Sequence, residues 1–140
     1  MSGKVVTIEP SVAPPWRLRP LALAAVGLAR LLERLPPRRL RRVLELASRG
    51  ARPADTTTAW RARNAVVAVS IRCAGPRCLQ RSIATVLLCR AGGSWPDWCT
   101  GVRTQPFQAH AWVAVDGVPV GENINDIRYF HRTMTVKVRS

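Results

Sequence analysis

Cys78 and His110 are the two residues whose types and positions in this sequence best fit a catalytic pair. A thiol becomes a strong nucleophile when a histidine takes its proton, because the resulting thiolate attacks carbonyl carbons readily. Cys78 falls where a helix is expected to begin, and His110 falls on an expected strand, 32 residues later. If the fold brings them together, the chain is a cysteine hydrolase or an acyl-transfer enzyme.

The position of Cys78 favours a reactive thiol. It follows Gly75 and Pro76, which end one helix and allow the next to start, so it lies in the first turn of the new helix. Unpaired amide groups and the positive end of the helix dipole stabilise a thiolate there and lower its pKa. A structural interpretation is also open, since a free cysteine is more often a small buried side chain.

The other three cysteines fit structural positions. Cys89 lies eleven residues after Cys78, on the same helix face but about 16 Å further along the axis, so we expect it in the core. Cys73 and Cys99 have no motif around them and are also interpreted as structural. A zinc site would need closely paired ligands, and the four cysteines contain no Cys-x-x-Cys pair. The sequence therefore predicts neither a metal nor a cofactor.

His110 stands near the start of a strand that is followed by a tight turn and a return strand carrying an acid. Asp116 and Gly117 fit a three-residue loop, which would place Glu122 directly across from His110 on the same face of the hairpin. A two-residue loop would place Asn123 there instead. We prefer Glu122 as the group that orients the imidazole.

Other polar residues near the hairpin are alternatives for this third role. Asp126 and Asn123 follow closely enough in the sequence to replace the glutamate. Asp116 lies at the turn tip, about 20 Å along the strand from the histidine, so we expect it to shape the turn instead. His131 lies outside the hairpin and is not expected in the site.

The expected chemical roles follow from these positions. Cys78 attacks a carbonyl carbon, while His110 takes the thiol proton and later delivers a proton to the leaving amine. Glu122 fixes the tautomer of the imidazole and stabilises its charged form. The backbone amide of Cys78 is the first expected donor to the oxyanion.

Helices fill the first part of the predicted fold, and strands fill the second. Leucines at helical spacing predict a helix over residues 21–35, two prolines at 36–37 end it, and a second helix runs to about residue 49. Asp55 or Thr56 caps a third helix that extends to about residue 73, although residues 66–69 also fit a strand. A fourth helix covers residues 77–90. Strands are expected at residues 5–8, 98–103, 107–115, 118–124 and 133–138.

The predicted architecture is α+β: N-terminal helices precede an antiparallel sheet that packs on the helix carrying Cys78. The 140 residues suffice for one packed core. Along the chain we distinguish an N-terminal arm and helical segment, residues 1–54, which is suited to docking a partner. Residues 55–140 form the expected catalytic core.

The net charge of +14 comes mostly from arginine, which supplies 20 of the 22 basic residues. Such a charge favours an anionic partner, but it also fits arginines spread over an ordinary solvated surface. A basic nucleic-acid-binding module stays an alternative function, although the sequence has no block of five like charges and no RNA-binding motif. A narrower hypothesis is that the arginines of the second helix dock an acidic face of a partner protein: Arg38, Arg39, Arg41 and Arg42.

The N-terminal residues lack the charged start, apolar stretch and small-residue cleavage site of a secretory signal. The longest apolar run, residues 21–29, has about half the length that a membrane-spanning helix needs. We expect a cytoplasmic protein with neither a membrane nor nucleic acid as its partner. Its four cysteines are then reduced thiols.

Four short stretches together resemble a known family: residues 78–82 (CLQRS), 101–102 (GV), 106–107 (PF) and 110–117 (HAWVAVDG). They are similar to the transglutaminase-like leader peptidases of lasso-peptide biosynthesis, in the form that is separate from the leader-recognition protein. The likeness spans about residues 60–125. The cysteine-to-histidine pattern and the HAWV stretch are specific only in combination.

The resemblance implies a triad of Cys78, His110 and an acid on a papain/transglutaminase-like core. It also implies that the enzyme cuts the leader from a ribosomally made precursor peptide, which a small leader-peptide-recognition protein presents. A separate ATP-dependent cyclase would then close a macrolactam on the new amino terminus. Glu122 departs from the family pattern, since many relatives carry aspartate there. The same triad also fits an enzyme that passes the acyl group to an amine, as transglutaminases and arylamine acetyltransferases do.

Overall fold

The computed structural model of the protein describes residues 18–70, 78–104, 107–122, 127 and 129–138. These residues form four helices, a four-stranded antiparallel sheet and a parallel pair of two-residue strands. Helices come first and the sheet follows, so the predicted α+β architecture is confirmed. The strand expected at residues 5–8 lies outside the described residues.

The first helix, α1 (Leu18–Leu32), begins three residues earlier than predicted and buries a different face. Its buried side chains are small: Ala22, Ala25, Val26 and Ala29. Among the leucines on which the prediction relied, Leu21, Leu28 and Leu31 are exposed, and Leu31 is 64% exposed. Leu32 and Leu35 are partly buried against the core. Small side chains let α1 pack closely on α5 and α3, and this packing overrides the leucine pattern. The predicted leucine face was therefore wrong for Leu21, Leu28 and Leu31.

The next two helices start where the sequence predicts. The second, α2 (Pro37–Ser48), begins on a proline and buries Leu40 and Leu44. The third, α3 (Thr56–Val69), is capped by Asp55, whose carboxylate accepts a hydrogen bond from the amide of Thr58 at 2.7 Å. It ends at Val69 instead of near residue 73, and residues 66–69 belong to the helix and not to a strand.

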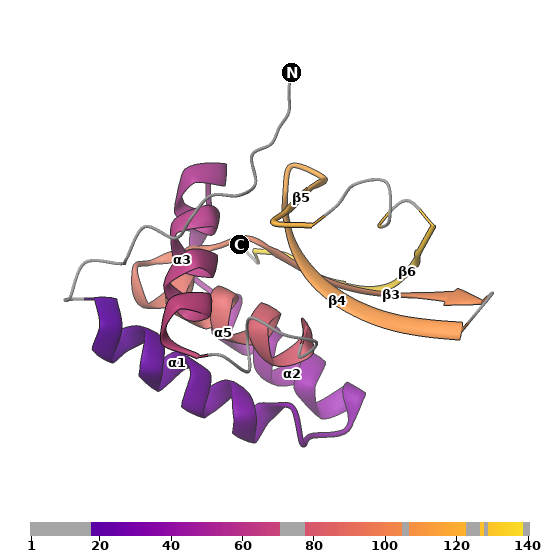
Figure 1. Ribbon diagram of the computed structural model, residues 1–140, viewed down its shortest axis with the longest axis horizontal. Helices are drawn as coiled ribbons and strands as arrows, with labels where there is room; N and C mark the ends of the chain where they lie inside the picture. The colour runs from indigo at the N-terminus through magenta and orange to yellow at the C-terminus, as the bar shows by residue number, and fades with distance from the viewer. Residues whose placement is uncertain (1–17, 71–77, 105–106, 123–126, 128, 139–140) are drawn as a thin grey trace.

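The fourth helix of the described chain, α5 (Cys78–Ala91), occupies the middle of the molecule. It packs against α1 and α3 on one side and against the sheet on the other, as Figure 1 shows. Because it is covered on several sides, it buries eight residues and has no clear polar face. In the part of the chain that the structure describes, no helix is long and apolar enough to cross a membrane.

The main sheet has the strand order β5-β4-β3-β6. Its strands are β3 (Asp97–Thr104), β4 (Phe107–Val115), β5 (Val118–Val120) and β6 (His131–Val136). β4 has the predicted bounds, but β5 is shorter than the predicted 118–124, and β6 begins and ends two residues early. A small parallel pair that the sequence did not predict, β1 (Arg52–Pro53) with β2 (Ser94–Trp95), joins the segments before α3 and after α5.

The turn between β4 and β5 has two residues, so the predicted three-residue loop was wrong. Val115 pairs with Val118, and Val113 pairs with Val120. Asp116 and Gly117 have φ angles of 52° and 81°. Two successive positive φ values are the geometry of the two-residue turn whose twist matches that of the flanking strands. The observed pairing is one residue out of register with the predicted one.

Candidate active site

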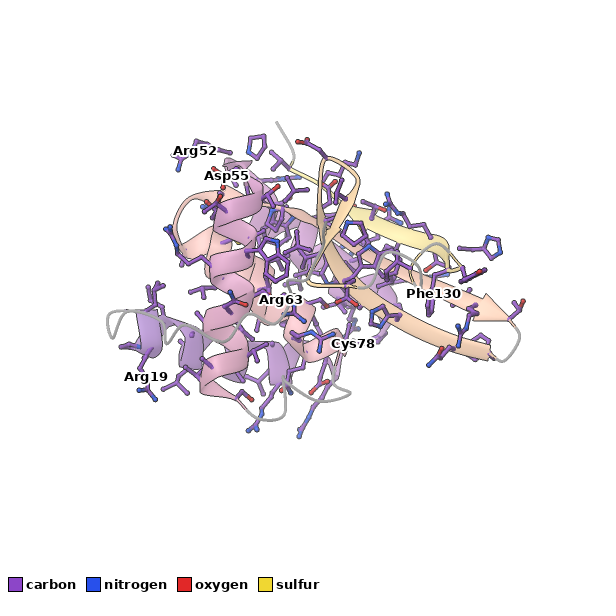
Figure 2. The ribbon with its side chains drawn as sticks, turned by 45° about the horizontal axis from the view of Figure 1, so that its top comes forward. Arg19, Arg52, Asp55, Arg63, Cys78 and Phe130 are labelled. Atoms are coloured by element: carbon purple, nitrogen blue, oxygen red, sulfur yellow. The ribbon has the colours of Figure 1, made fainter. Side chains whose placement is uncertain are left out.

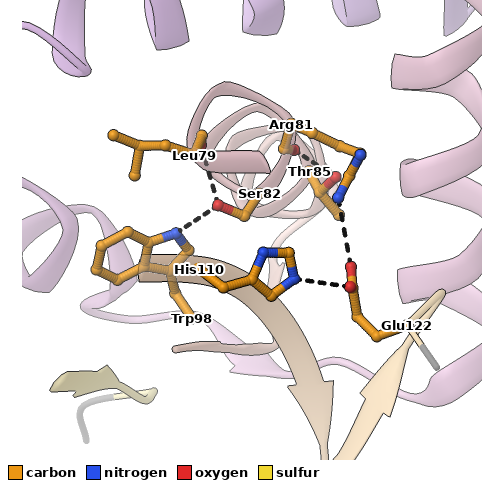
Figure 3. A network of polar contacts seen from close by, with 7 residues as sticks. All are labelled: Leu79, Arg81, Ser82, Thr85, Trp98, His110 and Glu122. Atoms are coloured by element: carbon orange, nitrogen blue, oxygen red, sulfur yellow. Dashed lines mark hydrogen bonds and ion pairs between the residues drawn. The ribbon is translucent and has the colours of Figure 1, made fainter. Parts of the chain in front are cut away.

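The structure brings Cys78, His110 and Glu122 together where the first turn of α5 meets β4. The thiol of Cys78 lies within reach of the imidazole of His110, close enough for each group to shift the pKa of the other. On the other side of the ring, Nε2 of His110 lies 2.8 Å from Oε1 of Glu122 (Figure 3). Figure 2 shows Cys78 at the end of its helix, close to the sheet. A continuous line of polar contacts thus runs from the sulfur to the carboxylate.

Cys78 is the first residue of α5 and is partly exposed. Burial raises the pKa of its thiol and is the largest single influence on it. Hydrogen bonds from His110 and from the backbone amide of Ala111, together with the positive charges of His110 and Arg81, outweigh burial and lower the pKa of Cys78 below its ordinary value. A lowered pKa increases the reactive thiolate fraction at neutral pH.

The pKa of the His110 imidazole shifts in the opposite direction, upwards. Its hydrogen bond with Cys78 raises the pKa of His110 to about 9, and the hydrogen bond and charge of Glu122 add to this effect against burial. The pKa of the thiol falls and that of the imidazole rises, and both shifts favour the form of the pair in which the proton is on the ring, a thiolate with an imidazolium.

Aromatic rings hold the imidazole in place. Trp112 stacks on His110 with ring centroids 5.8 Å apart, and Phe130 lies 5.5 Å from the same ring. Gly101, directly across from His110 on β3, leaves room for this packing. A Cβ there would lie 2.8 Å from the backbone oxygen of His131 and 2.9 Å from the ring of Trp112, so a side chain at this position would displace the strand or the indole.

Glu122 reaches His110 by a route that the sequence did not predict. In the observed register, a longer β5 would place residue 123 opposite His110. The strand ends at Val120 instead, and Gly121, with a φ of 75°, turns the chain. This turn brings the side chain of Glu122 to the imidazole.

Asp116 is the one acidic or amide alternative for the third residue that the structure describes. Asp116 lies in the turn, where it adopts a positive φ as expected of a turn-shaping residue. Asn123 and Asp126 lie outside the described residues. His131 is exposed at the start of β6.

The other cysteines contrast with Cys78. Cys89 is buried in the core, and burial raises the pKa of its thiol to about 12. Cys99 is also buried, and burial raises its pKa. Cys73 lies outside the described residues. Among the described cysteines, only Cys78 combines a lowered pKa with access to solvent.

A groove of about 490 Å³ opens beside the pair, and Cys78 and His110 both line it. Its remaining walls come from the α1–α2 connection, α2, α5, β3, β4 and β6. They are mostly apolar: Leu35, Leu40, Leu79, Trp98, Val102 and Met134. Ligand sites commonly combine such apolar walls with a few polar groups that fix orientation. The groove is large enough to hold a peptide side chain next to the sulfur.

The sequence analysis did not predict two polar contacts near Cys78 and His110. A terminal nitrogen of Arg81 lies 3.5 Å from Oε2 of Glu122. Nε1 of Trp98 donates to Oγ of Ser82 at 3.0 Å and joins β3 to α5 (Figure 3). One feature of the sequence could have indicated Arg81: it follows Cys78 by three residues, which places both on one face of a helix.

Comparison with known proteins agrees with this geometry. Residues 22–135 match the transglutaminase-like superfamily. The chain belongs to this superfamily. No curated protein and no solved structure matches it. Membership of the transglutaminase-like superfamily identifies the protein as a papain-like cysteine enzyme in general, and it confirms the resemblance seen in the sequence at the level of the superfamily.

Proposed function

We propose that the protein is a cysteine peptidase that removes the leader from a ribosomally made lasso-peptide precursor. The observation that supports this most directly is the line of contacts from the thiol of Cys78 through His110 to Glu122. Membership of the transglutaminase-like superfamily supports the same class of chemistry. The sequence resemblance to lasso-peptide leader peptidases supports the substrate.

The first half of the reaction forms an acyl-enzyme. The thiolate of Cys78 attacks the carbonyl carbon of the peptide bond between leader and core, and a carbon–sulfur bond forms. The carbon–nitrogen bond breaks as the imidazolium of His110 gives its proton to the leaving amine. The backbone amide of Cys78, at the positive end of α5, is suited to stabilising the oxyanion.

The second half hydrolyses the thioester. Neutral His110 takes a proton from water, the hydroxide attacks the thioester carbonyl, and the carbon–sulfur bond breaks. The thiolate of Cys78 and the imidazolium of His110 are restored, and Glu122 stabilises the charge on the ring. The products are a leader with a free carboxylate and a core peptide with a free amino terminus. An ATP-dependent cyclase would consume that amino terminus.

The surface of α2 supports a protein partner for this reaction. Several arginines of this helix are exposed on its outer side: Arg38, Arg39, Arg41 and Arg42. Arg41 is paired with Glu45 at 3.2 Å, while α2 buries Leu40 and Leu44 on its inner side. A basic face of this kind would attract an acidic surface on the leader-peptide-recognition protein or on the cyclase.

The decisive assay is cleavage of the precursor in the presence of the leader-peptide-recognition protein, followed by mass spectrometry. Cys78→Ala should stay folded and lose cleavage, whereas the matched variant Cys89→Ala should lower stability and keep cleavage. Retained cleavage by Cys78→Ala, or equal loss in both variants, would contradict the proposal. A product that carries a new amide instead of a free carboxylate would identify an acyltransferase with the same triad.

A further inference from the structure

Glu122 is held from two sides. Its Oε1 faces Nε2 of His110 at 2.8 Å, and its Oε2 lies 3.5 Å from a terminal nitrogen of Arg81. The side chains of Arg81 and Glu122 are only 13% and 12% exposed, so water and salt screen this pair much less than a surface pair. A charge-assisted hydrogen bond is usually shorter, roughly 2.7–2.9 Å, so Arg81 acts on the carboxylate chiefly through its charge.

Arg81 comes from the helix that carries the nucleophile. It follows Cys78 by three residues, so the two side chains share one face of α5. This turn of the helix is well fixed. The carbonyl of Arg81 accepts a hydrogen bond from Oγ1 of Thr85 at 2.8 Å, and the neighbouring Ser82 is bonded to Trp98 of β3 (Figure 3). Arg81 therefore ties the position of the acid to the position of the thiol.

The sheet does not hold Glu122 in place. The β4–β5 ladder ends at Val120, and Gly121 turns the chain away from it. The carboxylate therefore depends on its side-chain contacts for its position. Arg63 of α3 lies directly against this turn, because a Cβ on Gly121 would overlap its side chain. Arg63, labelled on α3 in Figure 2, lines a small cavity together with Arg81 and Glu122.

Positive charge is in excess around the triad. Arg63, Arg81 and protonated His110 supply three positive charges, and Glu122 supplies one negative charge. Burial lowers the pKa of Arg63, and the charge of Arg81 lowers it further. A thiolate at Cys78 provides a second negative charge, and the charge of Arg81 is among the influences that lower the pKa of this thiol. Removing Arg81 would thus remove stabilisation from both the carboxylate and the thiolate.

We propose that Arg81 is a positioning residue of the triad, which holds the second oxygen of Glu122 and links this acid to the helix that carries Cys78. Arg81 acts through Glu122 and through its charge, and not as a group that reacts with the substrate. The proposal rests on the proposed function, because it assigns a role within the same site.

Three variants test this role. Arg81→Met and Arg81→Gln remove the charge, and Arg81→Lys keeps it. Arg90→Met is the matched control, since Arg90 is another partly buried arginine of α5 and donates to the backbone carbonyls of Ala47 and Arg49 at 2.7 and 3.1 Å.

Two readouts separate positioning from simple packing. The first is the pH dependence of iodoacetamide alkylation at Cys78, assigned by peptide mass mapping. The second is the proton signal of the His110 ring N–H that faces Glu122, which is tractable because the chain has only 2 histidines. Melting temperatures, measured alongside, report stability alone.

We expect the neutral variants to move the acid limb of the alkylation profile to higher pH and to slow alkylation most at pH values below that limb, where a rise of one pKa unit lowers the rate about tenfold. The ring N–H signal should disappear through faster exchange with water. Arg81→Lys should keep the acid limb close to that of the wild type. Arg90→Met should lower the melting temperature and leave both readouts unchanged.

Unchanged readouts in both Arg81→Met and Arg81→Gln would overturn the positioning role, whatever happens to the melting temperature. The proposed function would still stand in that case if the wild-type alkylation profile showed a lowered thiol pKa for Cys78. A wild-type Cys78 with an ordinary thiol pKa would overturn the proposed function and the positioning role together.

Discussion

Glu122 contacts His110 at 2.8 Å, although it lies two residues beyond the end of the β4–β5 ladder. The contact depends on the end of β5 at Val120 and on the turn at Gly121. Because Glu122 follows the end of the strand, its carboxylate can approach one ring nitrogen of the imidazole. Its carboxylate then faces Nε2, which leaves Nδ1 for the thiol.

Glu122→Gln tests what the carboxylate contributes. The amide has nearly the same shape but no charge, so it cannot stabilise the imidazolium of His110 as the carboxylate does. We expect the pKa of His110 to fall from about 9 towards its ordinary value of 6.5, and cleavage to slow by about a hundredfold. An imidazole NMR titration and the precursor assay measure the two effects. An unchanged His110 titration would show that Glu122 is not the orienting acid.

Gly121→Ala tests the turn that places the side chain of Glu122 next to His110. Gly121 and Gly117 have φ angles of 75° and 81°, so alanine is strained at both positions, at a cost of about 1–3 kcal/mol. Only at Gly121 would the new Cβ also overlap another side chain, that of Arg63. We expect both variants to lose stability and Gly121→Ala alone to lose cleavage. Equal activity of the two variants would contradict a role of this turn in the site.

The alanine face of α1 can be tested by stability. Ala29 is fully buried against neighbouring helices, so Ala29→Leu should overpack the core and lower the free energy of unfolding by about 1–3 kcal/mol. Leu31 is 64% exposed, and Leu31→Ala should change the free energy of unfolding by less than about 0.5 kcal/mol. Chemical denaturation of the two variants provides the comparison. The reverse order would mean that the leucine face is the buried one.

Local patterns in the sequence were sufficient to predict much of the fold. The cap at Asp55, the proline at the start of α2 and the bounds of β4 depend on local backbone preferences, which the sequence displays directly. The position of Cys78 at the start of α5 was predicted in the same way. The buried face of α1 was not predictable, because it depends on how closely α5 and α3 approach, and that is a tertiary property.

The sequence predicted that Cys78, His110 and Glu122 lie together, but it did not predict the geometry by which they meet. His110 and Glu122 do meet, yet the register that led to this expectation is one residue out. Alternation along a strand predicts which side chains share a face only while the strand continues. The end of β5 at Val120 and the positive φ of Gly121 break that rule. The contact of Arg81 with Glu122 needs the packing of α5 on the sheet, which no local pattern reveals.

The pH dependence of cleavage should be bell-shaped. On the acid side, activity is lost as the thiolate of Cys78 gains a proton, at a pH below the ordinary thiol pKa because that of Cys78 is lowered. On the basic side, activity is lost as His110 gives up its proton at a pH of about 9 and can no longer protonate the leaving amine. The profile of kcat/KM for the precursor reports both limbs. A basic limb near the ordinary histidine pKa of 6.5 would contradict the assignment.

The central claim is that Cys78 is a thiolate because His110 holds its proton. Iodoacetamide alkylation of Cys78 as a function of pH, in the wild type and in His110→Ala, tests it most directly. The wild-type rate should reach half of its maximum below the ordinary thiol pKa of roughly 8.5, because the pKa of Cys78 is lowered. The variant should move that midpoint to 8.5 or above, since burial then dominates. A wild-type midpoint at the ordinary value, unchanged in His110→Ala, would contradict the claim.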